Sequence, residues 1–319
     1  MLSLFNKLTL SPLRKQGILG INARNLEYIF PGNPRELFPQ VDDKLKTKEI
    51  AHELQVPVPE TYGVIHYQNE VKKLSEIVEG KAAFVIKPAG GSGGSGILVI
   101  KKVTDEGYFK PGGKCLSEGD LFYHIHNILS GMFSLSGLGD TAFVEEAVKF
   151  DPVFDEIAYL GVPDLRIIIY RGVPAMAMLR LPSKASDGKA NLHKGGLGVG
   201  VDIATGKTLG GIQYNRYVKV HPDTDGDLRD RTIPYWPQIL EMAAKLGDRT
   251  QFSYLGVDIV LDKEKGPLLL EMNARPGLSI QIANQTGLLP RLNLIDEKIA
   301  SLDSFTEKID FAQKVFAVG

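Results

Sequence analysis

Residues 256–273 read Gly-Val-Asp-Ile-Val-Leu-Asp-Lys-Glu-Lys-Gly-Pro-Leu-Leu-Leu-Glu-Met-Asn, and this stretch decides the fold. Two apolar runs are separated by a short charged connection that contains glycine, which is typical of a β-hairpin. If Asp262 faces Pro267 across the turn, antiparallel counting places Asp258 directly opposite Glu271. The two carboxylates are therefore predicted to lie side by side on one face of the hairpin.

A third oxygen donor shares this face, because side chains alternate along a strand and Asn273 lies two residues beyond Glu271. Two carboxylates and an amide oxygen suit Mg²⁺, which completes its octahedron with water and substrate phosphates. The alternative is a solvated strand edge with ordinary acidic residues. Strands of a buried type rarely place three polar residues at one spot, so the sequence favours a metal site at Asp258, Glu271 and Asn273.

The composition is that of a soluble globular protein of about two domains. The chain has 319 residues, of which 43% are hydrophobic and 24% charged, with a net charge of −1. This charge offers no field to attract nucleic acid or an anionic membrane, and no stretch approaches the ~20 apolar residues of a membrane span. One cysteine, Cys115, fits a reducing compartment, and no signal-type region is recognised. We expect a cytoplasmic protein without nucleic-acid or membrane partners.

The remaining sequence predicts two α+β lobes that join near residues 145–150. Elements of the first lobe are expected at 42–54, 82–87, 97–102, 120–129 and 141–148. The second lobe is expected to be mostly sheet with one helix, with elements at 165–170, 175–181, 236–245 and the hairpin. The predicted domains are a short N-terminal segment at 1–40 that packs on the fold, a lobe at 41–146 and a lobe at 147–319.

A glycine-rich loop, Lys87-Pro-Ala-Gly-Gly-Ser-Gly-Gly-Ser-Gly96, formally contains the G-x-G-x-x-G pattern. A dinucleotide fold needs this pattern to open a helix, but Ile97–Lys102 continues as strand-type sequence. A nicotinamide-dependent oxidoreductase is therefore disfavoured, and a Walker loop is excluded because no Gly-Lys-Ser/Thr is present. The loop is instead predicted to be a flap whose amides close over phosphates, with Lys87 adding a positive charge; a flexible hairpin tip is the alternative.

Other polar residues are ordinary when each is taken alone. Lys44 near a helix start is by default a salt-bridged surface lysine, and Glu145–Val148 is a charged strand end that could also hydrogen-bond an adenine. Asp164, before an apolar strand, and Asn191, in a loop rich in glycine and lysine, are more often structural. Their order along the chain is more informative than any one of them.

Taken together, the motifs make the chain resemble the ATP-grasp ligases, and most closely the branch of the ribosomal-protein glutamate ligases. The resemblance runs from about Lys44 to Leu289, and its most specific parts are Asp43-Lys44, Lys87–Gly96, Asp164-Leu-Arg166, Asn191–Gly196, Gly256-Val-Asp258 and Leu270–Gly277. It implies an α+β ATP-grasp fold in which two lobes grip ATP between antiparallel sheets. It also implies ATP and two Mg²⁺ ions as cofactors, with Mn²⁺ as a substitute.

The resemblance assigns parts of the nucleotide to residues of this chain. Lys44, Lys87, Lys189 and Asn191 would contact the phosphates, Glu146 to Val148 would line the adenine, and Asp164 would hold the ribose. The full set of expected cofactor-binding residues is Lys44, Lys87, Gly91, Ser92, Gly93, Gly94, Ser95, Glu145, Glu146, Ala147, Val148, Asp164, Lys189 and Asn191. The expected metal ligands remain Asp258, Glu271 and Asn273.

Two departures from the family concern the substrate side of the site. Family ligases usually carry a full α/β domain before the first lysine, whereas about forty unconventional residues precede it here. The connector 149–163 is also longer than in the glutamate ligase branch. ATP binding therefore carries over to this chain, while the amino-acid and acceptor pockets do not.

The expected activity is an ATP-dependent carboxylate–amine ligation through an acyl phosphate, adding glutamate or another amino acid to an amine of an amino acid, peptide or protein. Arg180 or Arg275 would stabilise the transferring phosphoryl group, or form a structural salt bridge, and the amide of Gly277 would donate to the oxyanion. The alternatives are a non-catalytic ATP-binding subunit and an ATP-grasp phosphotransferase. The sequence leaves assembly into a homo-oligomer open.

Overall fold

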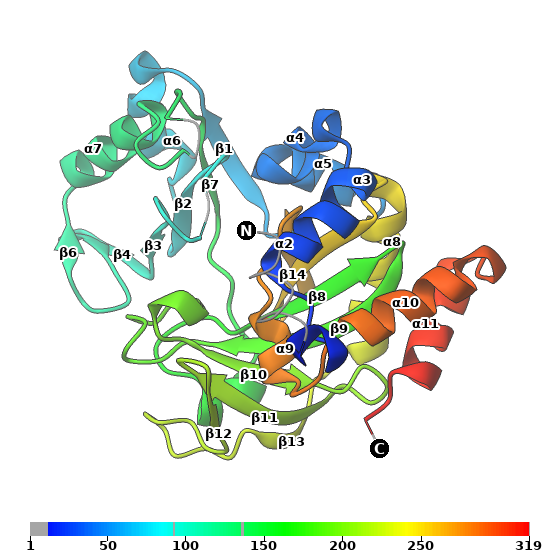
Figure 1. The fold of residues 1–319 in the computed structure, drawn as a ribbon. Helices are drawn as coiled ribbons and strands as arrows, with labels where there is room; N and C mark the ends of the chain where they lie inside the picture. Colours follow the sequence, from blue (N-terminus) through cyan, green and yellow to red (C-terminus); the bar gives the residue numbers. More distant parts are fainter. Residues whose placement is uncertain (1–11, 92, 135–136, 319) are drawn as a thin grey trace, which may run out of the picture.

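The larger of two lobes is built on an eight-stranded antiparallel sheet (Figure 1). The computed structural model describes residues 12–91, 93–134 and 137–318. The strands of this sheet are β8 (Asp164–Tyr170), β9 (Val173–Leu181), β10 (Leu197–Val201), β11 (Lys207–Gln213), β12 (Arg216–Val218), β13 (Arg229–Thr232), β14 (Tyr254–Asp262) and β15 (Gly266–Asn273). Their order is β12-β11-β10-β9-β8-β14-β15, and β13 pairs with β11.

The central strands of this sheet are mostly apolar because helices cover them, and their few charged residues gather at the site described below. The helical elements of the lobe are η4 (Pro152–Ile157), η5 (Leu192–Lys194), α8 (Trp236–Thr250), α9 (Ser279–Ala283), α10 (Leu289–Lys298), η6 (Ile299–Ser301) and α11 (Phe305–Val315). In α8, Ile239, Ala243 and Leu246 are spaced four and three residues apart and are fully buried. Every residue of β8 and β14 is buried, so any charge on these strands must find a partner inside the protein.

The smaller lobe has its own antiparallel sheet, in the order β1-β7-β2-β3. Its elements are β1 (Thr61–Ile65), η3 (Gln68–Lys73), α6 (Leu74–Ile77), β2 (Phe84–Pro88), β3 (Leu98–Ile100), α7 (Glu118–Leu129) and β7 (Ala142–Glu146), with an outer sheet of β4 (Lys102–Thr104), β5 (Gly107–Phe109) and β6 (Cys115–Leu116). Ser117 and Asp120 cap the start of α7 reciprocally, and Leu121, Ile125 and Ile128 then face the sheet. The strand that follows the glycine loop is thus real, as the sequence predicted.

The hairpin β14–β15 has the predicted pairing of Asp258 with Glu271, but its register next to the turn differs from the expected one. Asp262 pairs with Gly266, one residue away from the expected partner Pro267. A β-bulge between Asp258 and Ile259 then shifts the register by one residue, so that Asp258 pairs with Glu271 after all. The prediction of this pair is confirmed, but the turn is one residue tighter than expected and the bulge compensates for it.

The N-terminal residues that the structure describes pack on the larger lobe. They form α2 (Ile21–Ala23), η1 (Arg24–Ile29), α3 (Phe30–Gly32), η2 (Arg35–Leu37), α4 (Pro39–Asp42) and α5 (Lys44–Glu53). Leu19, Tyr28 and Ile29 are buried in the same core as β8 and β14, and the Tyr28 ring meets the Tyr170 ring edge-on at 5.5 Å. Residues 1–11 lie outside the described residues.

The two cores group the chain differently from the predicted division at residues 40 and 146. Helix α5 contributes Ile50 and Ala51 to the core of the larger lobe, although the sequence placed it in the smaller one. The expectation of a single helix in the second half is wrong, because α9, α10 and α11 are also present. The capping box of α11, Ser304 with Glu307, was a readable signal for it. In the ranges that the structure describes, no helix is long and apolar enough to cross a membrane.

Asn33 joins the N-terminal segment to the larger lobe through a fully engaged buried amide. Its Nδ2 donates to the carbonyls of Tyr254 (2.7 Å) and Ala274 (3.3 Å), and its Oδ1 accepts from the amide of Tyr254 (3.0 Å). Asn33→Ala should lower the free energy of unfolding by about 2 kcal/mol, since it removes these bonds inside the core.

Urea denaturation measures this loss, and Asn22→Ala, at an exposed position of α2, is the matched control. The control should shift stability by less than about 0.5 kcal/mol. Equal stability of the Asn33 variant and the control would show that the N-terminal segment is not anchored through this amide.

Candidate functional site

Four charged side chains meet on three neighbouring strands of the large sheet. Asp258 on β14 pairs in register with Arg166 on β8, and Asp164 on β8 pairs with Arg180 on β9. Arg166 donates to both oxygens of Asp258, at 2.8 and 2.5 Å, and Arg180 donates to Oδ2 of Asp258 at 2.6 Å. Arg180 also forms an ion pair with Asp164. The strand register alone therefore brings these groups together.

The pKa values in this cluster depend on burial and on Arg180, which pairs with both Asp164 and Asp258. Burial raises the pKa of Asp258, but the Arg166 and Arg180 guanidiniums outweigh it and bring the pKa down to about 2. Burial raises the pKa of Asp164 above its usual range, and Arg180 compensates only in part. Burial acts to lower the pKa of Arg180, but Asp164 and Asp258 outweigh it, so that this pKa is raised overall. Asp258 is therefore the firmly ionised carboxylate of the pair.

The three expected metal ligands differ in their availability. Asp258 is fully buried, and both of its oxygens accept from arginines. Glu271 is partly exposed, and no hydrogen bond or ion pair joins its carboxylate to another described residue. The Asn273 Oδ1 accepts from the amide of Arg275 at 2.8 Å. Glu271 and Asn273 thus fit a hard divalent cation as oxygen donors, whereas Asp258 serves first as the counter-ion of two arginines.

No further metal centre is present among the described residues, where no group of three or more His, Cys, Asp or Glu side chains could hold a metal ion. The trio at the hairpin has two carboxylates, and its third member is the amide of Asn273. A cation site in this part of the chain therefore rests on Glu271 and Asn273.

Lys44 contacts the glycine loop from helix α5, which packs against strand β15 of the hairpin. Its ammonium group donates to the carbonyl of Gly91, and its backbone amide donates to the carbonyl of Ala89 at 3.0 Å. Lys44 is buried, so the default interpretation as a surface lysine is wrong. Burial lowers the pKa of Lys44, while the carboxylate of Glu271 acts to raise it and the ammonium of Lys87 to lower it. The pKa of Lys44 therefore depends on charged side chains of both lobes, Glu271 of the larger and Lys87 of the smaller.

Lys87, at the end of β2, shares a carboxylate with a lysine that sequence reasoning missed. Glu145 on β7 is buried and forms ion pairs with Lys87 and with Lys48 of α5, the latter at 2.7 Å. Burial acts to raise the pKa of Glu145, but the two ammonium groups lower it overall. Lys48 follows Lys44 by one helical turn, and this spacing on one helix face was the signal that could have found it.

The loop before β10 reaches the tip of the glycine loop. Asn191 donates from Nδ2 to the carbonyl of Gly93 at 3.4 Å, so two glycine-rich loops from different lobes meet. Gly93, Gly94 and Ser95 are exposed, as is Lys189. Ser92 lies outside the described residues. The structure thus brings Lys44, Gly91, Gly93 and Asn191 to one side of the space between the lobes.

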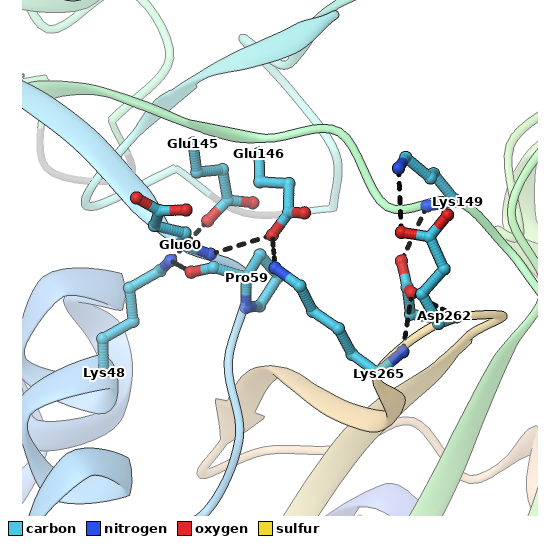
Figure 2. A network of polar contacts seen from close by, with 9 residues as sticks. Lys48, Pro59, Glu60, Glu145, Glu146, Lys149, Asp262 and Lys265 are labelled. Carbon is cyan, nitrogen blue, oxygen red and sulfur yellow. Dashed lines mark hydrogen bonds and ion pairs between the residues drawn. The ribbon is translucent and has the colours of Figure 1, made fainter.

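The hinge between the lobes, residues 145–150, contacts the tip of the β14–β15 hairpin (Figure 2). Glu146 accepts from the amide of Glu60 at 3.4 Å and pairs with Lys265 in the β14–β15 connection. The amide of Lys149 donates to Asp262 at 2.9 Å. Between these anchors, the backbone amides of residues 147–148 donate to no other described residue. The expected adenine-lining segment is therefore held at both ends, with its own amides free to bind a base.

The three expected catalytic residues differ in their exposure and in the groups that they contact. Arg180 is committed to the buried ion network, as the salt-bridge alternative had it. The exposed Arg275 guanidinium lies over the Phe38 ring, with its carbon 4.8 Å from the ring centroid. Gly277 is exposed, and nothing within 4 Å would obstruct a side chain there. Arg24 of the N-terminal segment donates to the carbonyl of Pro276 at 2.7 Å and so holds the loop that carries these two residues.

A family model for sugar-transfer associated ATP-grasp proteins matches residues 23–297, which is most of the chain. The chain belongs to this ATP-grasp family. The predicted ATP-grasp fold and nucleotide-binding class are thereby confirmed. The closer placement among the ribosomal-protein glutamate ligases stays a prediction. No curated protein matches the sequence.

The solved structures to which this chain is similar are distant from it in sequence. The ATP-grasp ligase PsnB, complexed with a minimal precursor, is 12% identical with a TM-score of 0.44, over 84% of this chain and 62% of that one. The D-cycloserine synthetase DcsG is 13% identical with a TM-score of 0.47, over 83% and 73%. The D-alanyl-alanine synthetase A from Vibrio cholerae is 13% identical with a TM-score of 0.47, over 88% and 66%. The chain spans less than two thirds of the length of PsnB.

Asp258 and Glu271 face each other on the hairpin but should respond differently to neutralisation. Asp258→Asn leaves Arg166 and Arg180 without their shared charge and should cost about 3 kcal/mol of unfolding free energy. Glu271→Gln removes an unpaired carboxylate and should change stability by less than about 0.5 kcal/mol. Urea denaturation at neutral pH measures both. If the two variants lose equal stability, Asp258 is not the anchor of the ion network.

Proposed function

We propose that this protein is an ATP-dependent carboxylate–amine ligase. The observation that carries the proposal is the packing of helix α5, which begins at Lys44, against strand β15, which carries Glu271. The Glu271 carboxylate is partly exposed and has no partner among the described residues, and the buried ammonium group of Lys44 also holds the glycine loop. This arrangement supports binding a cation and a polyphosphate side by side, which ATP-dependent chemistry requires.

Different residues of the chain would hold the phosphates, the adenine and the metal ions. Lys44, Lys87 and Lys189 would neutralise the phosphates, with Asn191 and the amides of the glycine loop as further donors. The adenine would lie on the amides of residues 147–148. Glu271 and Asn273 would hold Mg²⁺, or Mn²⁺ in its place, and two ions are expected. Asp258, the third expected donor, would have to share its oxygens with Arg166 and Arg180. Bound there, the metal supplies positive charge against the phosphate oxygens.

The proposed reaction has two steps. A carboxylate oxygen of one substrate attacks the γ-phosphorus of ATP, the bond to the β-phosphate oxygen breaks, and an acyl phosphate and ADP form. An amine nitrogen then attacks the acyl carbon, inorganic phosphate leaves, and the nitrogen loses a proton to give an amide. Arg275 is suited to the transferring phosphoryl group, since stacking on Phe38 holds its guanidinium in place without neutralising it. The amide of Gly277 would donate to the oxyanion.

Asp164 and Arg180 would contribute indirectly, because both lie in the buried ion network. Asp164 is buried against Arg180, so contact with the ribose would require that ion pair to loosen. Arg180 would act through Asp258 rather than on the phosphoryl group directly. The amino acid that is added, glutamate or another, and the amine acceptor, an amino acid, a peptide or a protein, would bind on the side of the site that the N-terminal segment and the Ala274–Gly277 loop form.

Glu271→Ala should reduce ADP release by roughly 100-fold at saturating Mg²⁺, because the phosphate charge loses its compensation. Folding should be retained, as thermal unfolding would show, and the affinity for Mn²⁺ in the presence of ADP should fall. Glu297→Ala, at an exposed position of α10, is the matched control. Turnover and Mn²⁺ affinity that equal those of the control would rule out Glu271 as a metal ligand.

The reaction itself is tested by incubating the protein with ATP, Mg²⁺ and panels of carboxylates and amines, and by following ADP release and product mass. An amide has the summed mass of its two substrates less one water. A product heavier by one phosphate would instead identify a phosphotransferase, and ATP binding without ADP release for any pair would identify a binding subunit. NADH should not bind, since the glycine loop leads into a strand.

A further inference from the structure

Lys48 lies deep beside the expected phosphate site without reaching it. Its side chain extends from α5, is about 8% exposed, and contacts Glu145 and Pro59 at the hinge (Figure 2). We propose that Lys48 is a positioning residue that keeps Glu145 neutralised, so that Lys87 can leave Glu145 for the phosphates of ATP. This proposal rests on the proposed function only in that the chain binds ATP.

The geometry gives Glu145 two cations where one would balance its charge. Its Oε2 pairs with Lys48 at 2.7 Å, and its Oε1 pairs with Lys87. Lys48 has a second bond that fixes its position, from Nζ to the carbonyl of Pro59 at 2.5 Å, and its ammonium lies 5.6 Å from the Phe143 ring centroid. Figure 2 shows Lys48, Pro59 and Glu145 converging at the base of the hinge. Lys48 is therefore the anchored partner, and Lys87 is the one free to exchange.

The cost of moving Lys87 depends on what remains at Glu145. A buried carboxylate that loses its last cation suffers a large desolvation penalty, whereas one that keeps a partner does not. With Lys48 present, Glu145 stays paired after Lys87 turns to the phosphates. Without Lys48, Lys87 would be the sole counter-ion of Glu145, and ATP would compete with a buried carboxylate for the same ammonium group. Lys48 should therefore strengthen phosphate binding from a distance.

The test measures the affinity of Lys48→Met for ATP by isothermal titration calorimetry and for adenosine by ligand-observed NMR. ATP binding should weaken about tenfold or more, while adenosine binding should stay within about twofold of wild type. A merely structural role would weaken both ligands together. Lys46→Met is the matched control, because Lys46 lies on the same helix but is exposed.

A second experiment removes the carboxylate of Glu145. It tests the proposal even if the Lys48→Met variant folds poorly. Glu145→Gln leaves no buried charge for Lys48 to neutralise, so Glu145→Gln and Lys48→Met/Glu145→Gln should bind ATP with affinities within about twofold of each other. The proposal is overturned if Lys48→Met binds ATP as tightly as Lys46→Met. It is also overturned if adenosine and ATP weaken equally, or if the effect of Lys48→Met persists in the Glu145→Gln background. Failure of the wild-type chain to bind ATP would instead refute the proposed function.

Discussion

The carboxylate of Asp258, buried between the guanidiniums of Arg166 and Arg180, is the interaction on which the site depends. It joins three neighbouring strands that are otherwise mostly apolar, and it can do so only because the strand register aligns the partners. Removing charge from such a cluster is costly, since each guanidinium would be left in a medium that solvates it poorly. The cluster therefore fixes the strand pair from which Glu271 and Asn273 present their oxygens.

The N-terminal segment forms hydrogen bonds with the loop that follows this hairpin. Arg24 and Asn33 donate to backbone carbonyls of the loop that follows Asn273, and Phe38 lies under the guanidinium of Arg275. Backbone carbonyls need partners inside a protein, because an unpaired one is costly. A few short helices thus restrain the loop that follows the hairpin. The N-terminal segment consequently fixes the position of this loop and of its exposed Arg275.

Much of the site could be predicted from local sequence. The glycine loop leading into a strand, the pair Asp43-Lys44 at a helix start, and the opposition of Asp258 and Glu271 all follow from patterns of a few residues, because turn chemistry, capping and strand alternation act locally. The bulge in the hairpin could not be predicted in this way. The sequence-based counting erred by one residue at the turn. The register is restored by Leu270 of β15, which has no partner on β14, while β14 pairs with β8 without interruption.

The sequence by itself determined the ATP-grasp family and the pairing of Asp258 with Glu271, and it predicted Asn273, Lys44 and Lys87 as further site residues. Tertiary structure alone decided which charges pair with one another. Arg180 looked available for phosphate chemistry but is held by two aspartates, Lys44 looked like a surface residue but is buried, and Lys48 drew no attention although it shares Glu145 with Lys87. The physical reason is that the energy of a charge depends on its burial and on its neighbours in space, which residues distant in sequence provide.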